Sequence, residues 1–374
     1  MMKPMQQIRG ISAVCLLALP LVLSGCGLFG SESASIDAPP PEVEAQMLQI
    51  SGDTTLDSGV FSPLVQDDVE TTNKGTDETA KTASAGERTT VFLEDGNGLL
   101  APVSLSLPKS EASTKIKNSL MALVSKGAYT SSLPAGFQGV LPEGTEVQSV
   151  TVDKSNLAVV EFNSEFNSYD PLDERKILEA ITWTLTDQDN IKGVQLWVDG
   201  KKLTEMPLQG TPLDRPLSRT MGINLPKQGP MLMNSSAVTV YFSTASPEGI
   251  PYYVPVTRFV PAGQEPLKAA LNELIAGPED GDGLEMVMTQ GTVLDSVEAG
   301  QNGVVTVSLT DDMFADAKDV PAEMLESVVL TVAQNTEDSL VQIRLNGKET
   351  VTATDNVDYG KPVSAPEYLN EIPL

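Results

Sequence analysis

Hydrophobic and polar positions alternate in several short stretches of the chain beyond residue 88. Val103, Leu105 and Leu107 are separated by Ser104 and Ser106, which predicts a strand with one buried face. Further stretches with strand character predict strands at residues 89–93, 147–152, 157–162 and 194–198. The last of these runs into Asp199-Gly200, a pair that is typical of tight hairpin turns.

Between these strands, apolar residues recur at helical spacing. Ile116, Leu120, Leu123 and Val124 fall at i, i+4, i+7 and i+8, so they form one stripe along a helix. A second helix is predicted to start at Asp170-Pro171, with the aspartate as N-cap and the proline in the first turn. Its predicted buried face consists of Ile177, Leu178, Ile181 and Leu185. The order of elements is therefore β-β-α-β-β-α-β.

This pattern occurs twice. Several dipeptides recur at a constant spacing of 147 residues: Gly144-Thr145 as Gly291-Thr292, Ser149-Val150 as Ser296-Val297, and Leu178-Glu179 as Leu325-Glu326. Such regular recurrence indicates an internal duplication. We expect an α+β fold made of two tandem copies, residues 88–205 and 237–350, of a small sandwich in which two helices pack on one face of a sheet.

The segments around the two copies have a different composition. Residues 206–236 contain five prolines and are predicted to form an extended, semi-rigid linker. Residues 351–374 form a polar C-terminal tail that we expect to lie along the second copy. Residues 26–87 are acidic and rich in small polar residues, with too few apolar side chains to form a core, so they are predicted to be a disordered tether.

The start of the chain has the pattern of an export signal. Lys3 and Arg9 precede an apolar stretch, Ile11–Leu23, that is too short to span a bilayer. We interpret residues 1–25 as a signal peptide.

The end of that signal resembles the bacterial lipobox, in the sequence Leu23-Ser24-Gly25-Cys26. The resemblance implies that Cys26 is acylated, becomes the new N-terminus and anchors the protein on the extracytoplasmic face of a membrane. Two or more acyl chains, palmitate among them, would make this anchor stable. An ordinary cleaved signal, in which Cys26 has no role, is the alternative.

Charge and composition limit the kinds of ligand and catalytic chemistry that the chain can have. The net charge is −27, and removal of residues 1–25, whose two charges are positive, leaves −29. This field repels nucleic acid. The chain contains no histidine, which excludes histidine-based nucleophile pairs and zinc sites. Cys15 would leave with the signal, so no disulfide is expected, and neither a metal nor another cofactor is predicted.

Four acidic residues are candidates for paired-carboxylate hydrolysis: Glu161, Glu165, Asp311 and Asp312. The interpretation that we favour is that they cap turns or solvate the ends of strands. Trp183 and Trp197 are expected in the core, as large aromatics usually are. The repeated pairs Gly144-Thr145 and Gly291-Thr292 are interpreted as turns that define the domain.

Two segments carry a family resemblance, "LPEGTEVQSVTVDKSNLAVVEFNSEF" and "MTQGTVLDSVEAGQNGVVTVSLTDDMF". They resemble the GerMN domain, as do the upstream pairs "APVSLSLP" and "VPVTRFVP". A lipobox followed by two such domains is similar to the GerM-type sporulation and germination lipoproteins. The resemblance implies a channel complex in the envelope of spore-forming bacteria and modules like the ring-building modules of secretion systems. The second copy lacks the Leu-Pro-Glu that precedes the turn in the first, so the two copies need not make equivalent contacts.

Two functions from different classes follow. The first is a non-enzymatic scaffold whose tandem domains bind other envelope or sporulation channel proteins. The second is a protein that binds or remodels the cell-wall glycan peptidoglycan in a groove between the domains. Binding of purified peptidoglycan, or its absence, separates them.

Overall fold

A computed structural model describes residues 86–374, apart from residues 189, 227–233, 301, 338–339 and 374. The predictions for the signal peptide and the lipobox residues Leu23, Ser24, Gly25 and Cys26 lie outside the described residues, as does nearly all of the predicted tether. Among the helices of the described part, none is long and apolar enough to cross a membrane.

The first repeat begins with an antiparallel hairpin and continues with two helices and a mixed sheet. Its elements are β1 (Glu87–Glu94), β2 (Leu100–Leu107), α2 (Ala112–Ala122), β3 (Val147–Val152), β4 (Leu157–Phe162), α3 (Glu174–Thr186), β5 (Gly193–Val198) and β6 (Lys201–Lys202). Asp170 accepts a hydrogen bond from the N–H of Leu172 and caps a short 3-10 turn, Pro171–Asp173, that leads directly into α3. The β5–β6 turn has positive φ at both Asp199 and Gly200, as its sequence predicts.

The second repeat has the same order. Its elements are β7 (Ser235–Ala245), β8 (Pro251–Pro261), α4 (Pro266–Ala276), β9 (Val293–Ala299), β10 (Val304–Thr310), α5 (Ala322–Asn335), β11 (Leu340–Leu345) and β12 (Val363–Ser364). In the larger sheet of each repeat, the first two strands pair antiparallel, β3 with β4 and β9 with β10. The next pairs, β4 with β5 and β10 with β11, are parallel, because a helix connects the two strands. The α+β class and the two tandem copies are confirmed.

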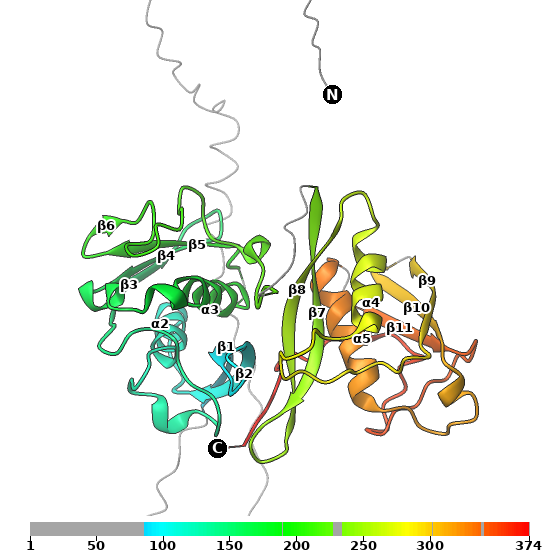
Figure 1. Ribbon diagram of the computed structural model, residues 1–374. Helices are drawn as coiled ribbons and strands as arrows, with labels where there is room; N and C mark the ends of the chain where they lie inside the picture. Colours follow the sequence, from blue (N-terminus) through cyan, green and yellow to red (C-terminus); the bar gives the residue numbers. More distant parts are fainter. Residues whose placement is uncertain (1–85, 189, 227–233, 301, 338–339, 374) are drawn as a thin grey trace, which may run out of the picture. The chain divides into compact units, whose positions relative to one another are not determined.

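The first two strands of each repeat do not join the larger sheet. The strand orders are β1-β2 and β3-β4-β5-β6 in the first repeat, and β7-β8 and β12-β11-β10-β9 in the second. The helices contact the hairpin on one side and the sheet on the other, so each repeat has three layers (Figure 1). The helices cover one face of the sheet, as expected, and the hairpin adds a third layer.

Because the helices lie between two β layers, they are buried on more than one stripe. Beyond the four predicted positions, α3 also buries Ala180, Thr182, Trp183 and Thr184. The Trp183 ring lies 5.5 Å from the ring of Phe92 on β1. The Thr184 hydroxyl accepts a hydrogen bond from the Phe92 N–H at 2.9 Å and so satisfies a donor of the hairpin. Thr331, the equivalent residue of α5, does the same for the N–H of Tyr241 at 3.2 Å.

The segment after the first repeat packs against it. Glu174, only 2% exposed, accepts hydrogen bonds from the N–H groups of Gln209 and Thr211 at 2.8 and 3.1 Å. The Tyr169 hydroxyl donates to the same carboxylate at 2.6 Å. This carboxylate therefore ties the start of the predicted linker to helix α3.

Candidate functional site

The joint between the two repeats is formed by the inner hairpin strands, β2 and β8, and by two asparagines that lie between them. The side-chain oxygen of Asn224 accepts from the N–H of Leu100 at 2.8 Å. Its Nδ2 group donates to the carbonyl of Leu100 and to the carbonyl of Pro255, both at 2.8 Å. One carboxamide thus binds the backbones of both repeats.

Asn370, from the C-terminal tail, repeats this arrangement with the roles of the strands exchanged. Its oxygen accepts from the N–H of Tyr253 at 2.8 Å, and its Nδ2 donates to the carbonyls of Tyr253 and Pro102 at 2.8 and 2.7 Å. Leu100 and Tyr253 are equivalent in the duplication, as are Pro102 and Pro255. The joint therefore has local pseudo-two-fold symmetry, and we call these two side chains the asparagine clips.

The sequence explains why side chains are needed here. Both inner strands are open sheet edges, and their backbone groups are buried, so each group requires a partner. Pro102 and Pro255 lack an N–H, which prevents the two edges from pairing directly as a continuous sheet. Both clips have left-handed backbone, with φ 48 at Asn224 and 55 at Asn370, a region that asparagine tolerates better than most residues.

Further contacts cross the joint. The Tyr252 hydroxyl donates to Asp95 at 2.9 Å, and its ring lies 5.0 Å from that of Phe137. Arg219 donates to Asp187 of the first repeat at 2.8 Å and to Gln334 on α5 at 2.9 Å. The described residues from 86 onward accordingly belong to one compact unit.

The sheet of the first repeat has an outward face that is partly apolar. Its register places Val159 beside Gln195 and Thr151, and Glu161 beside Trp197. These residues are half-buried or exposed, whereas the alternate positions of β4 and β5 are buried. Trp183 lies in the core, as expected, but the expectation for Trp197 was wrong because strand alternation places its indole on the outward face.

The outward face of the second repeat is more polar. The position equivalent to Trp197 is Arg344, which is exposed, and the position equivalent to Val159 is Thr306. The two repeats therefore present different surfaces on equivalent sheets.

The repeated glycine-threonine pairs lie in turns that are hydrogen-bonded to the residues just after the central strands, β4 and β10. Gly144 has φ +84, where a side chain would be strained, and Thr145 is 1% exposed. Asn163, just after β4, donates to the carbonyl of Gly144 and accepts from the N–H of Glu146, both at 2.9 Å.

In the second repeat, Asp311 takes the place of Asn163. Its carboxylate accepts from the hydroxyl of Thr292 at 2.7 Å, from the hydroxyl of Thr289, and from the N–H of Met313 at 2.9 Å. Asp311 is 1% exposed. Burial alone raises the pKa of this carboxyl, but the hydroxyls of Thr289 and Thr292 and the N–H of Met313 outweigh burial and hold the pKa below its ordinary value.

Two of the other acidic candidates, Glu161 and Glu165, are also engaged locally. Glu161 accepts from the Ser149 hydroxyl and from the Gly200 N–H, both at 2.9 Å. Glu165 accepts from Ser164 at 3.2 Å, and Asp312 is exposed. These contacts fit the interpretation as turn caps and strand-end residues. Within the ranges that the structure describes, no group of three or more Cys, Asp or Glu side chains is arranged to hold a metal.

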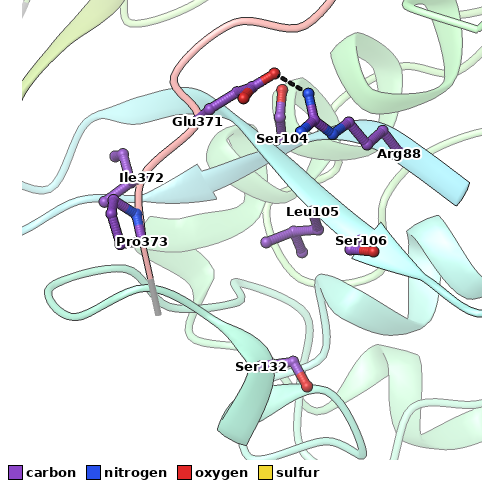
Figure 2. Close-up of a pocket in the computed structure, with 8 residues that line it drawn as sticks. All are labelled: Arg88, Ser104, Leu105, Ser106, Ser132, Glu371, Ile372 and Pro373. Atoms are coloured by element: carbon purple, nitrogen blue, oxygen red, sulfur yellow. Dashed lines mark hydrogen bonds and ion pairs between the residues drawn. The ribbon is translucent and has the colours of Figure 1, made fainter. Parts of the chain in front are cut away.

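A cavity of about 330 Å³ lies where the C-terminal tail crosses β2 (Figure 2). Its two charged side chains are paired with each other, because Arg88 forms an ion pair with Glu371. The hydroxyl of Ser104 is also occupied, since it donates to the carbonyl of Leu369 at 2.7 Å. The cavity is thus part of the tail's attachment to the first repeat.

The chain is thus a tandem α+β protein, in which a three-layer module with a hydrogen-bonded glycine-threonine turn occurs twice. Comparison with known proteins gives its family. The family described as "Germane: Sporulation and spore germination" matches residues 90–204 and 239–351, once in each repeat. The chain belongs to this family.

A relative and a solved structure are similar over most of the chain. "Spore germination protein GerM" of Bacillus subtilis (strain 168) is 34% identical over 369 residues, covering 96% of this chain and 97% of that protein. The structure of the "Tandem GerMN domains of the sporulation protein GerM from Bacillus subtilis" covers 77% of this chain and all of that chain (100%), with a TM-score of 0.72 and 34% identity. The predicted resemblance to tandem GerMN proteins is confirmed.

We predict that Asn224→Ala lowers the free energy of unfolding by about 3 kcal/mol, because it leaves buried backbone groups without partners. Asn224→Asp should be at least as harmful, since it places a carboxylate oxygen against two carbonyls. Asn190→Ala is the matched control, because exposed Asn190 is also left-handed, with φ 66, and reports the backbone cost alone. Urea unfolding of the three variants measures this; equal losses in Asn224→Ala and Asn190→Ala would contradict the clip.

A pH dependence follows from Asp311. Because its folded-state pKa is lowered, its contribution to stability is present above the ordinary value of 3.8 and is lost as the pH falls through the folded pKa. We expect the stability difference between the natural protein and Asp311→Asn to be constant near neutral pH and to shrink below about pH 4. Unfolding free energies measured from pH 2.5 to 7 test this, and a difference that does not change with pH would rule it out.

Proposed function

We propose that this chain is a non-enzymatic lipoprotein of the cell envelope that scaffolds or stabilises a multiprotein complex in sporulation or spore germination. Its family membership supports the biological setting. The contacts of Glu161 and Asp311 support the non-enzymatic part, because each carboxylate is bound to a turn or strand of its own repeat.

The asparagine clips carry the scaffold proposal. They join the two repeats through their inner hairpins, so both larger sheets keep an outward face that the joint does not use. A protein with two binding faces in a fixed relation can bind two partners, or two sites on one partner, with less loss of conformational freedom than a flexible tandem.

The outward face of the first repeat is the surface that we assign to a protein partner. Trp197 lies there beside the paired strand residues Val159 and Gln195, and its indole N–H donates to Gln195 at 3.0 Å. A half-buried tryptophan is the kind of residue that dominates binding energy at protein interfaces. The partners that we propose are other envelope proteins of the sporulating cell.

The lipid at Cys26 and the acidic tether complete the proposal. A lipid anchor confines the two repeats to the neighbourhood of one membrane, and a tether of about sixty residues lets them search for partners there. Confinement raises the effective concentration, so modest affinities suffice for assembly.

Trp197→Ala is expected to reduce recovery of crosslinked partners at least tenfold, because interface tryptophans often contribute 2 kcal/mol or more. Its effect on the melting temperature should be small, since the indole is not in the core. Arg344→Ala, at the equivalent position of the second repeat, is the matched control. In vivo crosslinking in sporulating cells, with quantification of the neighbours, measures this; equal losses in both variants would argue against the assigned face.

Cys26→Ala is expected to release the protein from the membrane fraction and to weaken assembly without changing the melting curve. Detergent phase partition measures the anchor, crosslinking measures assembly, and calorimetry measures the fold. An unchanged membrane fraction would remove the lipid anchor from the proposal, and an altered melting curve would count against an independent tether.

A further inference from the structure

The second helix of each repeat carries a glutamate at an equivalent position, the buried Glu179 on α3 and the half-buried Glu326 on α5. In the first repeat, Arg175 lies one turn earlier and its Nε donates to Glu179 at 2.7 Å. The other oxygen of Glu179 accepts from the N–H of Asn224 at 3.0 Å. The charge of this carboxylate is therefore balanced by an arginine of its own helix, and the pair supports an asparagine clip.

The second repeat lacks this arginine. The residue equivalent to Arg175 is Ala322, and the hydrogen bond to Glu326 comes from the hydroxyl of Tyr253. Among the ion pairs of the described residues, none involves Glu326. The half-buried Glu326 carboxylate thus has a neutral donor where Glu179 has a cation.

A cavity of about 470 Å³ opens beside this carboxylate. Apolar side chains form much of its wall, together with two carboxylates and a tyrosine: Val329, Leu340, Val363, Glu326, Asp355 and Tyr359. Asp355 is already engaged, because it accepts from the Tyr359 hydroxyl at 3.1 Å and from the N–H of Val357 at 2.9 Å. Glu326 is therefore the carboxylate with the least compensation in the cavity.

An uncompensated carboxylate in such a setting is unfavourable. Burial raises the pKa of Glu326, the Tyr253 hydrogen bond opposes that shift, and the charges of Asp355 and Glu323 add to it. A cation in the cavity would oppose this rise in the pKa of Glu326, as Arg175 opposes the rise that burial causes in the pKa of Glu179. In the first repeat, a guanidinium pairs with the equivalent carboxylate, that of Glu179. In the second repeat, the cavity beside Glu326 leaves space for a guanidinium from another molecule.

We propose that the cavity over Glu326 binds the arginine side chain of a protein partner, with the guanidinium on Glu326 and the methylene stem against Val329 and Leu340. Arginine matches a carboxylate through paired donors, and its stem packs well on apolar walls. The chain's net charge of −27 also attracts a cationic partner. This inference rests on the proposed function in one respect, since it takes the arginine from an assembly partner.

The test uses the full chain in mild detergent and a small probe, N-acetyl-arginine amide. Its neutral isostere, N-acetyl-citrulline amide, replaces the guanidinium by a urea of the same shape. We expect saturable binding of the arginine probe, measured by NMR chemical-shift changes, at least tenfold tighter than binding of the citrulline probe. Glu326→Gln should weaken arginine binding at least tenfold, and Glu349→Gln, which removes an exposed charge, should not. Equal affinity for both probes, or binding unchanged in Glu326→Gln, would overturn the proposal.

A second variant supplies the cation from the protein's own helix α5. Ala322→Arg recreates the arrangement of Arg175 and Glu179, so it should abolish binding of the arginine probe and raise the melting temperature by a few degrees. Ala322→Gln, with a long neutral side chain, should do neither. Undiminished binding in Ala322→Arg would contradict the proposed site. No partner takes part in these binding experiments. The arginine site can therefore be disproved while the crosslinking result for Trp197 still supports the scaffold proposal, and the scaffold proposal can be disproved while the arginine site stands.

Discussion

Two open strand edges meet at the centre of this protein, and their buried backbone groups must find partners. An isolated hairpin is marginal in water, and an unpaired edge invites association with other chains. Direct pairing of β2 with β8 would meet Pro102 and Pro255, which cannot donate. The carboxamides of Asn224 and Asn370 hydrogen-bond to these backbone groups instead, because an asparagine side chain carries the same kinds of donor and acceptor as a peptide. The remaining architecture follows from having the hairpins inside and the larger sheets outside.

The joint also explains which parts of the two repeats stayed alike and which diverged. Residues that serve the joint are symmetric, since Leu100 and Tyr253 have the same role toward their clips. Other positions differ, with Trp197 against Arg344 on the outward sheets and Arg175 against Ala322 beside the equivalent glutamates Glu179 and Glu326. Duplication thus preserved the contacts that hold the repeats together and released the outer surfaces to acquire separate roles.

Much of the fold could be predicted because its signals are local. The helix stripes, the turn at Asp199-Gly200 and the recurrence of dipeptides depend only on neighbouring residues and on chain order. The separate hairpin could not be predicted, because residues 89–93 are buried on both faces and show no alternation. The alternation of Val194, Leu196 and Val198 predicts the outward direction of Trp197, and this local signal overrides the general tendency of tryptophan to be buried.

The clips were not predictable in the same way. Asn224 lies in a proline-rich segment and Asn370 in a polar tail, where single asparagines usually serve as turn residues. Their roles depend on two backbones that are far apart in sequence. The paired prolines in equivalent hairpin strands were the available hint, since a proline in each strand indicates an edge that does not pair.

A fixed joint between unlike faces has a consequence for assembly. If both faces were the same, the pseudo-two-fold axis of the joint would present two equivalent contacts and favour a symmetric partner. With a tryptophan on one sheet and an arginine on the other, the two contacts differ in chemistry, and a partner that fits one does not fit the other. The scaffold proposed above would therefore join different components, one on each face.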